Sequence, residues 1–100
     1  MKNLINQQVV FRCDKSGVWA GTVTEVCAEF QKIKVENAHR LWNWQAKDGI
    51  SLSEVATNGV VGGKICKPVA FVYLNNNDVY EAISMTNEAF KTVQDHAKEF

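Results

Sequence analysis

The residues best suited to binding chemistry form one short run, Arg40-Leu41-Trp42-Asn43-Trp44. In an extended strand alternate side chains share a face, so Arg40, Trp42 and Trp44 are expected to point the same way. Two indole rings beside a guanidinium make a stacking platform. Stacking a base on an aromatic ring is worth about 1–3 kcal/mol, and Arg binds phosphate through two parallel hydrogen bonds. The run therefore predicts a receptor for a small nucleotide-type ligand.

Further side chains extend this predicted receptor. Asn37, His39 and Asn43 carry groups that hydrogen-bond base edges or a ribose. Arg12 offers a second cation and Trp19 a third aromatic ring, on either side of an expected hairpin turn at residues 14–17. The ligand-binding residues expected from the sequence are Arg40, Trp42, Trp44, Arg12, Trp19, Asn37, His39 and Asn43.

The same residues also have structural explanations. Trp usually fills a core or an interface, and Arg packs over it as a cation–π pair without any ligand. Arg12 has a ready salt-bridge partner in Asp14 or Glu25. Trp and Arg also dominate the energetic hot spots of protein–protein interfaces, so an inhibitor or accessory module that binds a protein is the alternative to a nucleotide receptor.

No motif for catalysis or metal binding stands out. The chain has no Gly-rich phosphate loop, no nucleophile elbow and no His pair at metal spacing. Its two histidines, His39 and His96, lie far apart, and the spacing of Cys13, Cys27 and Cys66 fits no zinc pattern. We expect a non-enzymatic protein without metal or cofactor. An enzyme would need a Cys and a His together in one cleft.

Composition favours one soluble domain over residues 1–100. The chain is 46% apolar, with a formal net charge of zero. A duplex-DNA binder normally carries a basic excess, so duplex DNA is not an expected partner. No segment has the length of a membrane span or the pattern of a signal peptide, and three cysteines among apolar residues suggest buried, reduced thiols. We expect a cytoplasmic protein with no membrane partner.

Alternating apolar residues and turn signals predict a mainly β, α+β chain. The expected strands cover residues 8–13, 18–28, 32–36, 38–45, 65–74 and 79–85. Gly17 is expected to close the first hairpin at positive φ, Gly21 to mark a bend or a close backbone approach, and Gly62-Gly63 to form a turn. Pro68 places part of the fifth strand at an edge or a bulge.

Two helices complete the prediction. A capping box at Ser51 starts a short inserted helix that ends near Gly59, with Leu52, Val55 and Ala56 on one side. Thr86 caps a final helix whose apolar stripe comprises Phe90, Val93, Ala97 and Phe100. Five or six short strands with these helices indicate a small curved sheet or a partly open, SH3-like β-barrel.

Several motifs resemble an uncharacterised family of small phage and prophage proteins. They are Arg12, the hairpin Ser16-Gly17-Val18 with Ala20-Gly21, the segment at residues 37–44, and Ser51-Leu52-Ser53 with Gly59-Val60. Members of that family show Asn-Ala-Arg-Arg-x-Trp-x-Trp in the third of these, whereas this chain has His39 in place of the first Arg. It also has Val55 where a Leu is usual. The resemblance spans about residues 10–60 and leaves the C-terminal third uncovered.

The resemblance implies an origin rather than a reaction. Small phage proteins in the host cytoplasm often act against host defences, by binding a host protein or by sequestering a nucleotide signal. By analogy, the expected partner is a nucleotide-type ligand or a host protein. Three Trp residues and a terminal Phe are hard to bury in 100 residues, so a homo-oligomer is also expected.

Overall fold

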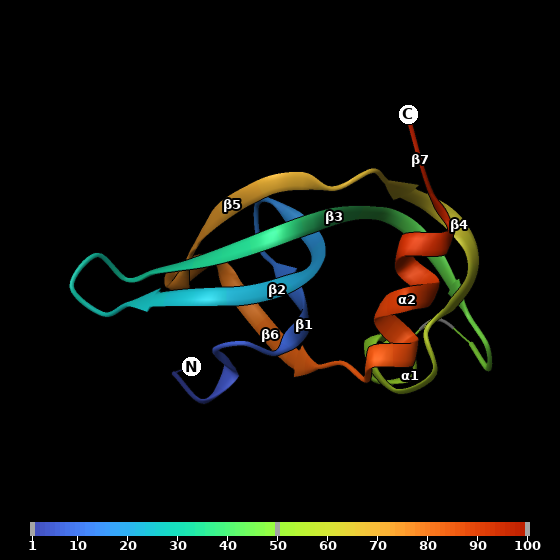
Figure 1. Cartoon of the computed structure of the whole chain (residues 1–100), viewed down its shortest axis with the longest axis horizontal. Helices are drawn as coiled ribbons and strands as arrows, with labels where there is room; N and C mark the ends of the chain where they lie inside the picture. Colours follow the sequence, from blue (N-terminus) through green and yellow to red (C-terminus); the bar gives the residue numbers. More distant parts are fainter. Residues whose placement is uncertain (1, 50, 100) are drawn as a thin grey trace.

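A computed structural model describes residues 2–49 and 51–99 of the chain. In this part of the chain two helices accompany a mixed sheet of seven strands that does not close on itself (Figure 1). The strands are β1 (Gln8–Cys13), β2 (Gly17–Cys27), β3 (Lys32–Ala46), β4 (Val60–Cys66), β5 (Val69–Asn75), β6 (Val79–Ser84) and β7 (Ala97–Lys98). The helices are α1 (Leu52–Asn58) and α2 (Asn87–Asp95), with 3-10 turns η1 (Lys2–Leu4) and η2 (Asn76–Asp78).

The sheet is organised around the long strand β3. The strands follow the order β6-β1-β2-β3-β4-β7, and β5 pairs with the first half of β3 while β4 pairs with the second half. Every pairing is antiparallel except that of β4 with β7. The expected partly open, barrel-like α+β fold is therefore confirmed, with β7 as an additional short strand.

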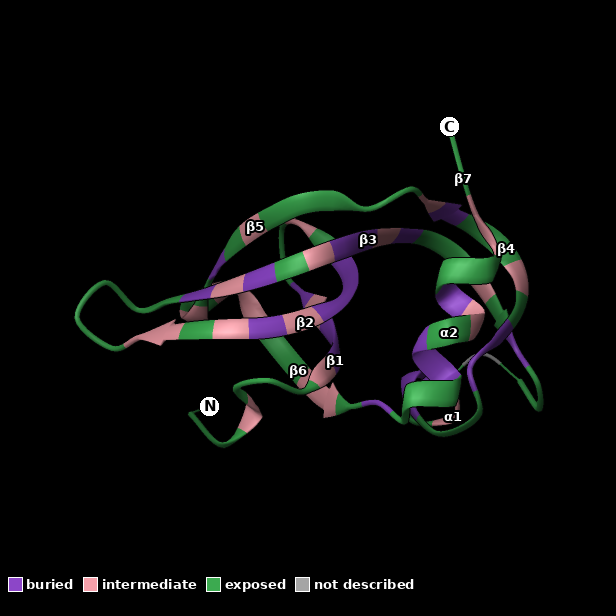
Figure 2. Cartoon of the chain, in the orientation of Figure 1, coloured by how far each residue is buried: buried purple, intermediate pink, exposed green. Residues whose placement is uncertain are grey.

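Two hydrophobic clusters lie on opposite faces of this sheet. The barrel core is enclosed by β1, β2, β3 and β5 and consists of Val9, Phe11, Cys13, Trp19, Val23, Ile33, Val35, Ala38 and Leu74. The helix-side core lies where α1 and α2 cover the second half of the sheet, and it includes Val10, Leu41, Leu52, Ile65 and Phe90. Figure 2 shows buried segments running through both regions. Strand β3 contributes the apolar residues of its first half to the barrel core and those of its second half to the helix-side core.

Local turn and cap chemistry agrees with the sequence predictions. Gly17 has φ of 84° at the end of the first hairpin turn. A Cβ on Gly21 would lie 2.9 Å from the carbonyl oxygen of Glu36, so this glycine allows β2 and β3 to approach closely. Ser51 and Thr86 each accept a hydrogen bond from a backbone N–H of the helix that they precede, at 3.1 and 3.0 Å. Both predicted N-caps are therefore confirmed.

The strand predictions need three corrections. The segments 32–36 and 38–45 form one strand, β3, because its pairing with the neighbouring strands continues on both sides of Asn37. Asn37 itself has φ of 52°. Gly62 and Gly63 lie inside β4 rather than in a turn. The predicted strand 65–74 is two strands, β4 and β5, separated at Lys67 and Pro68. The cause of the last error is the missing N–H of proline, which interrupts a ladder that hydropathy alone extends.

The final helix is shorter than predicted. It ends at Asp95 with His96 as its C-cap, so Ala97 is not on the helix and pairs instead with Ile65 as part of β7. Phe90 and Val93 are buried in the helix-side core as expected, whereas Phe100 lies outside the described residues. Of the helices in the described part of the chain, none has the length and apolar content needed to cross a membrane.

Candidate functional site

Three of the predicted residues come together as a stack at one end of the barrel. The guanidinium carbon of Arg40 lies 4.3 Å from the ring centroid of Trp19 and 5.2 Å from that of Trp42. Trp19 on β2 is directly opposite Arg40 on β3. Trp19 is 7% exposed, whereas Trp42 is 61% exposed. Arg40 therefore connects a core indole to a surface indole, and we call these three residues the Arg40 platform.

The barrel core holds the platform in place. Phe11 on β1 is opposite Trp19, and both rings belong to the barrel core. A cation over a Trp ring gains about 0.5–2 kcal/mol, depending on how far it is desolvated. Because Trp19 is fixed by packing, the guanidinium above it has a defined position before any ligand arrives.

Arg40 lacks a carboxylate partner in the described structure, in contrast to the other arginine of the chain, Arg12. Arg12 pairs with Glu81, Lys34 with Glu25 and Lys67 with Glu99. Within residues 2–49 and 51–99, Arg40 forms neither an ion pair nor a side-chain hydrogen bond, and its contacts are with aromatic rings. Its N–H donors are thus available to an anion.

The prediction that Trp44 shares a face with Arg40 and Trp42 is wrong. The pairing of β3 with β4 shifts between Leu41 and Asn43, which makes Trp42 the extra residue of a β-bulge. A bulge reverses the alternation of side chains beyond it. Trp44 consequently packs, half-buried, against the helix-side core together with Leu41. The platform has one exposed indole rather than two.

His39 is buried rather than available to a ligand. It is 1% exposed, lies edge-on to Phe90 with ring centroids 5.9 Å apart, and donates from Nδ1 to the carbonyl oxygen of Cys66 at 2.8 Å. Burial lowers the pKa of His39, and the bond to Cys66 only partly offsets this effect. The ring is therefore held neutral, with Nε2 left without a hydrogen-bond partner in the described structure.

Arg12 does not join the platform either. Arg12 pairs with Val18 across β1 and β2, while the adjacent pair joins Phe11 and Trp19, so Arg12 lies on the opposite face of the sheet from Trp19. Its Nε donates to Glu81 Oε1 at 3.0 Å. The salt bridge anticipated for Arg12 is present, but its partner is on β6 rather than Asp14 or Glu25.

The two asparagines have backbone roles. Asn37 is half-buried at the positive-φ position within β3, three residues before Arg40. Asn43 is exposed, and its Oδ1 accepts a hydrogen bond from the N–H of Lys64 at 3.0 Å, which ties β4 to the strand just beyond the bulge. Both residues shape the strand that carries Arg40 and Trp42.

The cysteines are free, but only Cys13 is fully buried, and this burial raises its pKa. Cys27 and Cys66 are half-buried, contrary to the expectation for all three. His39 contacts the backbone carbonyl of Cys66 rather than its thiol. Across the described residues, no three His, Cys, Asp or Glu side chains gather in a way that could hold a metal ion.

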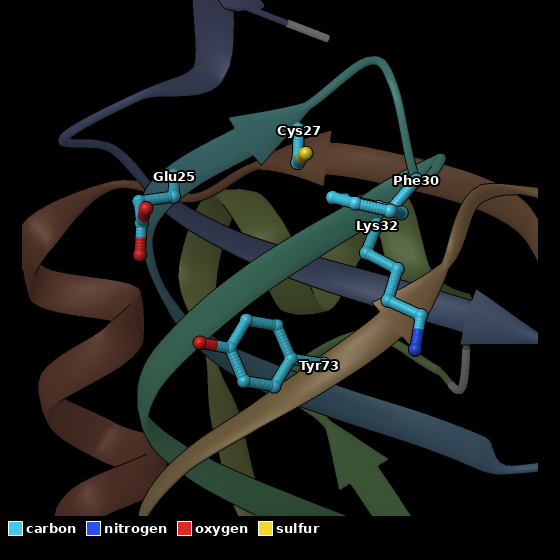
Figure 3. A pocket seen from close by; sticks show the side chains of 5 residues that line it. All are labelled: Glu25, Cys27, Phe30, Lys32 and Tyr73. Atoms are coloured by element: carbon cyan, nitrogen blue, oxygen red, sulfur yellow. The ribbon is translucent and has the colours of Figure 1, made fainter.

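A hollow of about 390 Å³ lies at the other end of β3, away from the platform. Its lining comes from β2, the β2–β3 loop, β3 and β5, and consists of Glu25, Cys27, Phe30, Lys32 and Tyr73 (Figure 3). The sequence prediction described residues 65–74 only as an apolar strand and did not identify the exposed aromatic side chains beside this hollow. The alternation of exposed Phe71 and Tyr73 with Val72 and buried Leu74 was the available signal.

The fold and the platform define a small α+β protein built on a partly open β-barrel, with an arginine stacked between a buried and an exposed tryptophan. The chain belongs to a family described as a domain of unknown function (DUF6948), whose model matches residues 6–93. This confirms the expected membership of an uncharacterised family. No curated protein is significantly similar to the chain.

Proposed function

We propose that this protein is a non-enzymatic binding protein that captures a small nucleotide-type ligand on the Arg40 platform. One observation carries the proposal. Arg40 is stacked on a fixed indole, has no acidic partner in the described structure, and lies beside an indole that is 61% exposed. A planar base stacks on Trp42 while the guanidinium of Arg40 binds the phosphate.

The charge of the whole chain fits a small ligand better than a long polyanion. A formal net charge of zero provides no general attraction for many phosphates. One preorganised guanidinium is suited to one or two phosphate groups.

Calorimetric titration with a panel of linear and cyclic nucleotides tests the proposal. We expect Trp42→Ala to weaken binding about 5- to 150-fold through loss of stacking. Arg40→Gln removes a charge-assisted hydrogen bond and is expected to weaken binding about 10-fold or more. Tyr80→Ala is the matched control, because Tyr80 is a 71% exposed aromatic residue on β6.

Two results would contradict a nucleotide receptor. One is the absence of heat from every nucleotide in the panel. The other is binding that both platform variants leave as tight as in the Tyr80→Ala control, with circular dichroism showing that all variants are folded.

A protein partner is the second candidate. Trp42 lies on a bulge and exposes most of its ring, a geometry that suits insertion into a pocket of another protein. Trp and Arg are also the residues most enriched at interface hot spots. A protein that is captured from host lysate by the native chain, and lost with Trp42→Ala, would favour this candidate.

We also propose a phage or prophage origin, action in the host-cell cytoplasm and a role against host defences. The support is the resemblance of residues 10–60 to small phage proteins, together with a platform suited to a nucleotide signal. Expression of the chain in a host whose defence depends on such a signal should restore phage growth, and Arg40→Gln should abolish this protection.

A further inference from the structure

Strand β5 presents exposed apolar side chains at the edge of the sheet, with the ammonium of Lys34 from β3 lying 4.7 Å from the centre of the Phe71 ring. Among the described residues it pairs only with β3, and along Val69–Asn75 it carries no charged residue. Val69, Phe71 and Tyr73 point outward and are 46%, 50% and 53% exposed. The two rings meet at right angles with centroids 5.5 Å apart. Figure 2 shows β5 as the most extensively exposed long strand in this view.

Such an edge normally has a covering partner. An edge strand leaves alternate N–H and C=O groups unpaired, and proteins protect edges with charges, prolines, bulges or very short strands. The edge strand β6 carries Glu81, and β7 has only two residues. Strand β5 has seven residues and none of these protections, since Pro68 precedes it. An exposed apolar surface of this kind marks an interaction site.

We propose that a second copy of this chain pairs with β5 in antiparallel fashion, about a twofold axis at Val72, so that the sheet continues across two protomers. A twofold interface requires a self-complementary strand. An uncharged strand meets this requirement because it cannot repel its own copy.

The position of the axis follows from pairing rules. Residues opposite each other in a sheet share a face, so an outward residue must oppose an outward residue. The twofold axis must therefore pass through a residue of β5 and not between two neighbouring residues. At Val72, Phe71 faces Tyr73 of the partner and all seven residues of β5 find a partner. With the axis at Phe71 or Tyr73, only residues 69–73 or 71–75 overlap.

Charges on β3 favour the same axis. Phe71 is opposite Glu36 and Tyr73 is opposite Lys34. With the axis at Val72, Phe71 of one protomer lies opposite Tyr73 of the other. Glu36 then flanks this aromatic pair on the first protomer, and Lys34 flanks it on the second. With the axis at Phe71 the row joins two glutamates, and with the axis at Tyr73 it joins two lysines. Only the Val72 axis avoids a row with two like charges, while the Lys34 ammonium keeps its own pairing with Glu25 at 3.7 Å and its place 4.7 Å from the centre of the Phe71 ring.

The outward faces are also complementary. The pairing brings two Phe and two Tyr rings into one cluster, and aromatic pairs gain about 0.5–1.5 kcal/mol beyond the area that they bury. Val69 of the partner would lie opposite Asn75, an exposed uncharged residue.

Light scattering of the full chain and of two double variants tests the interface and its register. The native chain is expected at twice its 11.2 kDa mass. Phe71→Lys/Tyr73→Lys places like charges opposite each other twice and should be monomeric. Phe71→Lys/Tyr73→Glu places opposite charges there and should remain dimeric. Tyr80→Lys is the control for a charge at another exposed aromatic site and should remain dimeric.

Hydrogen exchange provides a second measurement, in which β5 amides of the native chain should exchange faster on dilution. A native chain that stays monomeric at its highest attainable concentration would overturn the proposal. A dimer that survives the Lys/Lys pair, or a Lys/Glu variant as monomeric as the Lys/Lys variant, would also overturn it. Trp42→Ala should leave the mass unchanged, so failure of the nucleotide proposal and failure of this interface are distinguishable.

Discussion

At the scale of single residues, the neighbours His39 and Arg40 show how one strand gives adjacent polar side chains opposite roles. His39 faces the helix-side core and is buried against Phe90. Arg40 points to the other face and stacks on Trp19. A neutral imidazole tolerates a dry site with one hydrogen bond, whereas an unpaired guanidinium does not. Burial therefore leaves Arg40 as the residue of this pair that can bind an anion.

The buried His39 should make the chain less stable in mild acid. Its pKa in the folded protein is lowered from the ordinary value of 6.5, so the unfolded chain takes up the proton first. Stability is complete above pH 6.5 and falls as the pH drops below it. The fall is at most about 1.4 kcal/mol per pH unit until the folded pKa is reached.

Urea denaturation between pH 7.5 and about 5, above the range of most carboxyl groups, measures this effect. We expect the fall to be missing in His39→Gln and retained in His96→Gln. Equal slopes for native protein and His39→Gln would show that His39 is not the titrating group.

At the scale of elements, the β-bulge at Trp42 decides the shape of the candidate site. It sends Trp42 outward and Trp44 toward the helix-side core. The partner strand accommodates this irregularity through Gly63, which has φ of 129° and lies opposite Trp44. A Cβ at Gly63 would overlap the Asn43 carbonyl oxygen and the Trp44 Cα. The platform thus depends on a glycine in the neighbouring strand.

Comparison of Gly63→Ala with Gly49→Ala isolates this close approach. Gly49 has nearly the same φ, 133°, but faces open space. Backbone strain alone costs about 1–3 kcal/mol, so Gly49→Ala should lower the free energy of unfolding by that amount. Gly63→Ala should cost more, because backbone atoms must move. Denaturant midpoints measure both, and equal losses would contradict a tight β3–β4 approach.

At the scale of the whole molecule, electrical neutrality restricts what the platform can bind. Ion pairs neutralise Arg12, Lys34 and Lys67 within the described part of the chain, and the formal net charge is zero. The cation of Arg40 is therefore not part of a basic excess of the whole chain. Binding should depend on a few contacts and not on a long electrostatic track.

Salt dependence of nucleotide binding tests this view. Each phosphate neutralised on a single strand contributes a slope of about −0.7 to log K against log salt. For one or two phosphates we expect a slope between about −0.7 and −1.4 in calorimetric titrations. A much steeper slope, with tighter binding to longer oligonucleotides, would indicate a single-stranded nucleic-acid binder instead.

Local chemistry was sufficient to predict much of the fold. The turn at Gly17, the close approach at Gly21 and the caps at Ser51 and Thr86 follow from the conformational limits of single residues. The period-two pattern located most strands. In the site, the proximity of Arg40 and Trp42 followed from strand alternation, but Trp19 was included only as a neighbour of the hairpin turn.

From the amino-acid sequence alone, most of the strands, both helices with their N-caps and the presence of an arginine among tryptophans were predictable, because these depend on interactions within a few residues. Tertiary structure decided which of these side chains meet and which face water. The pairing of β3 with β4 reversed Trp44, the helices buried His39, and β6 supplied the partner of Arg12. Such choices depend on contacts between residues distant in sequence, to which no local pattern is sensitive.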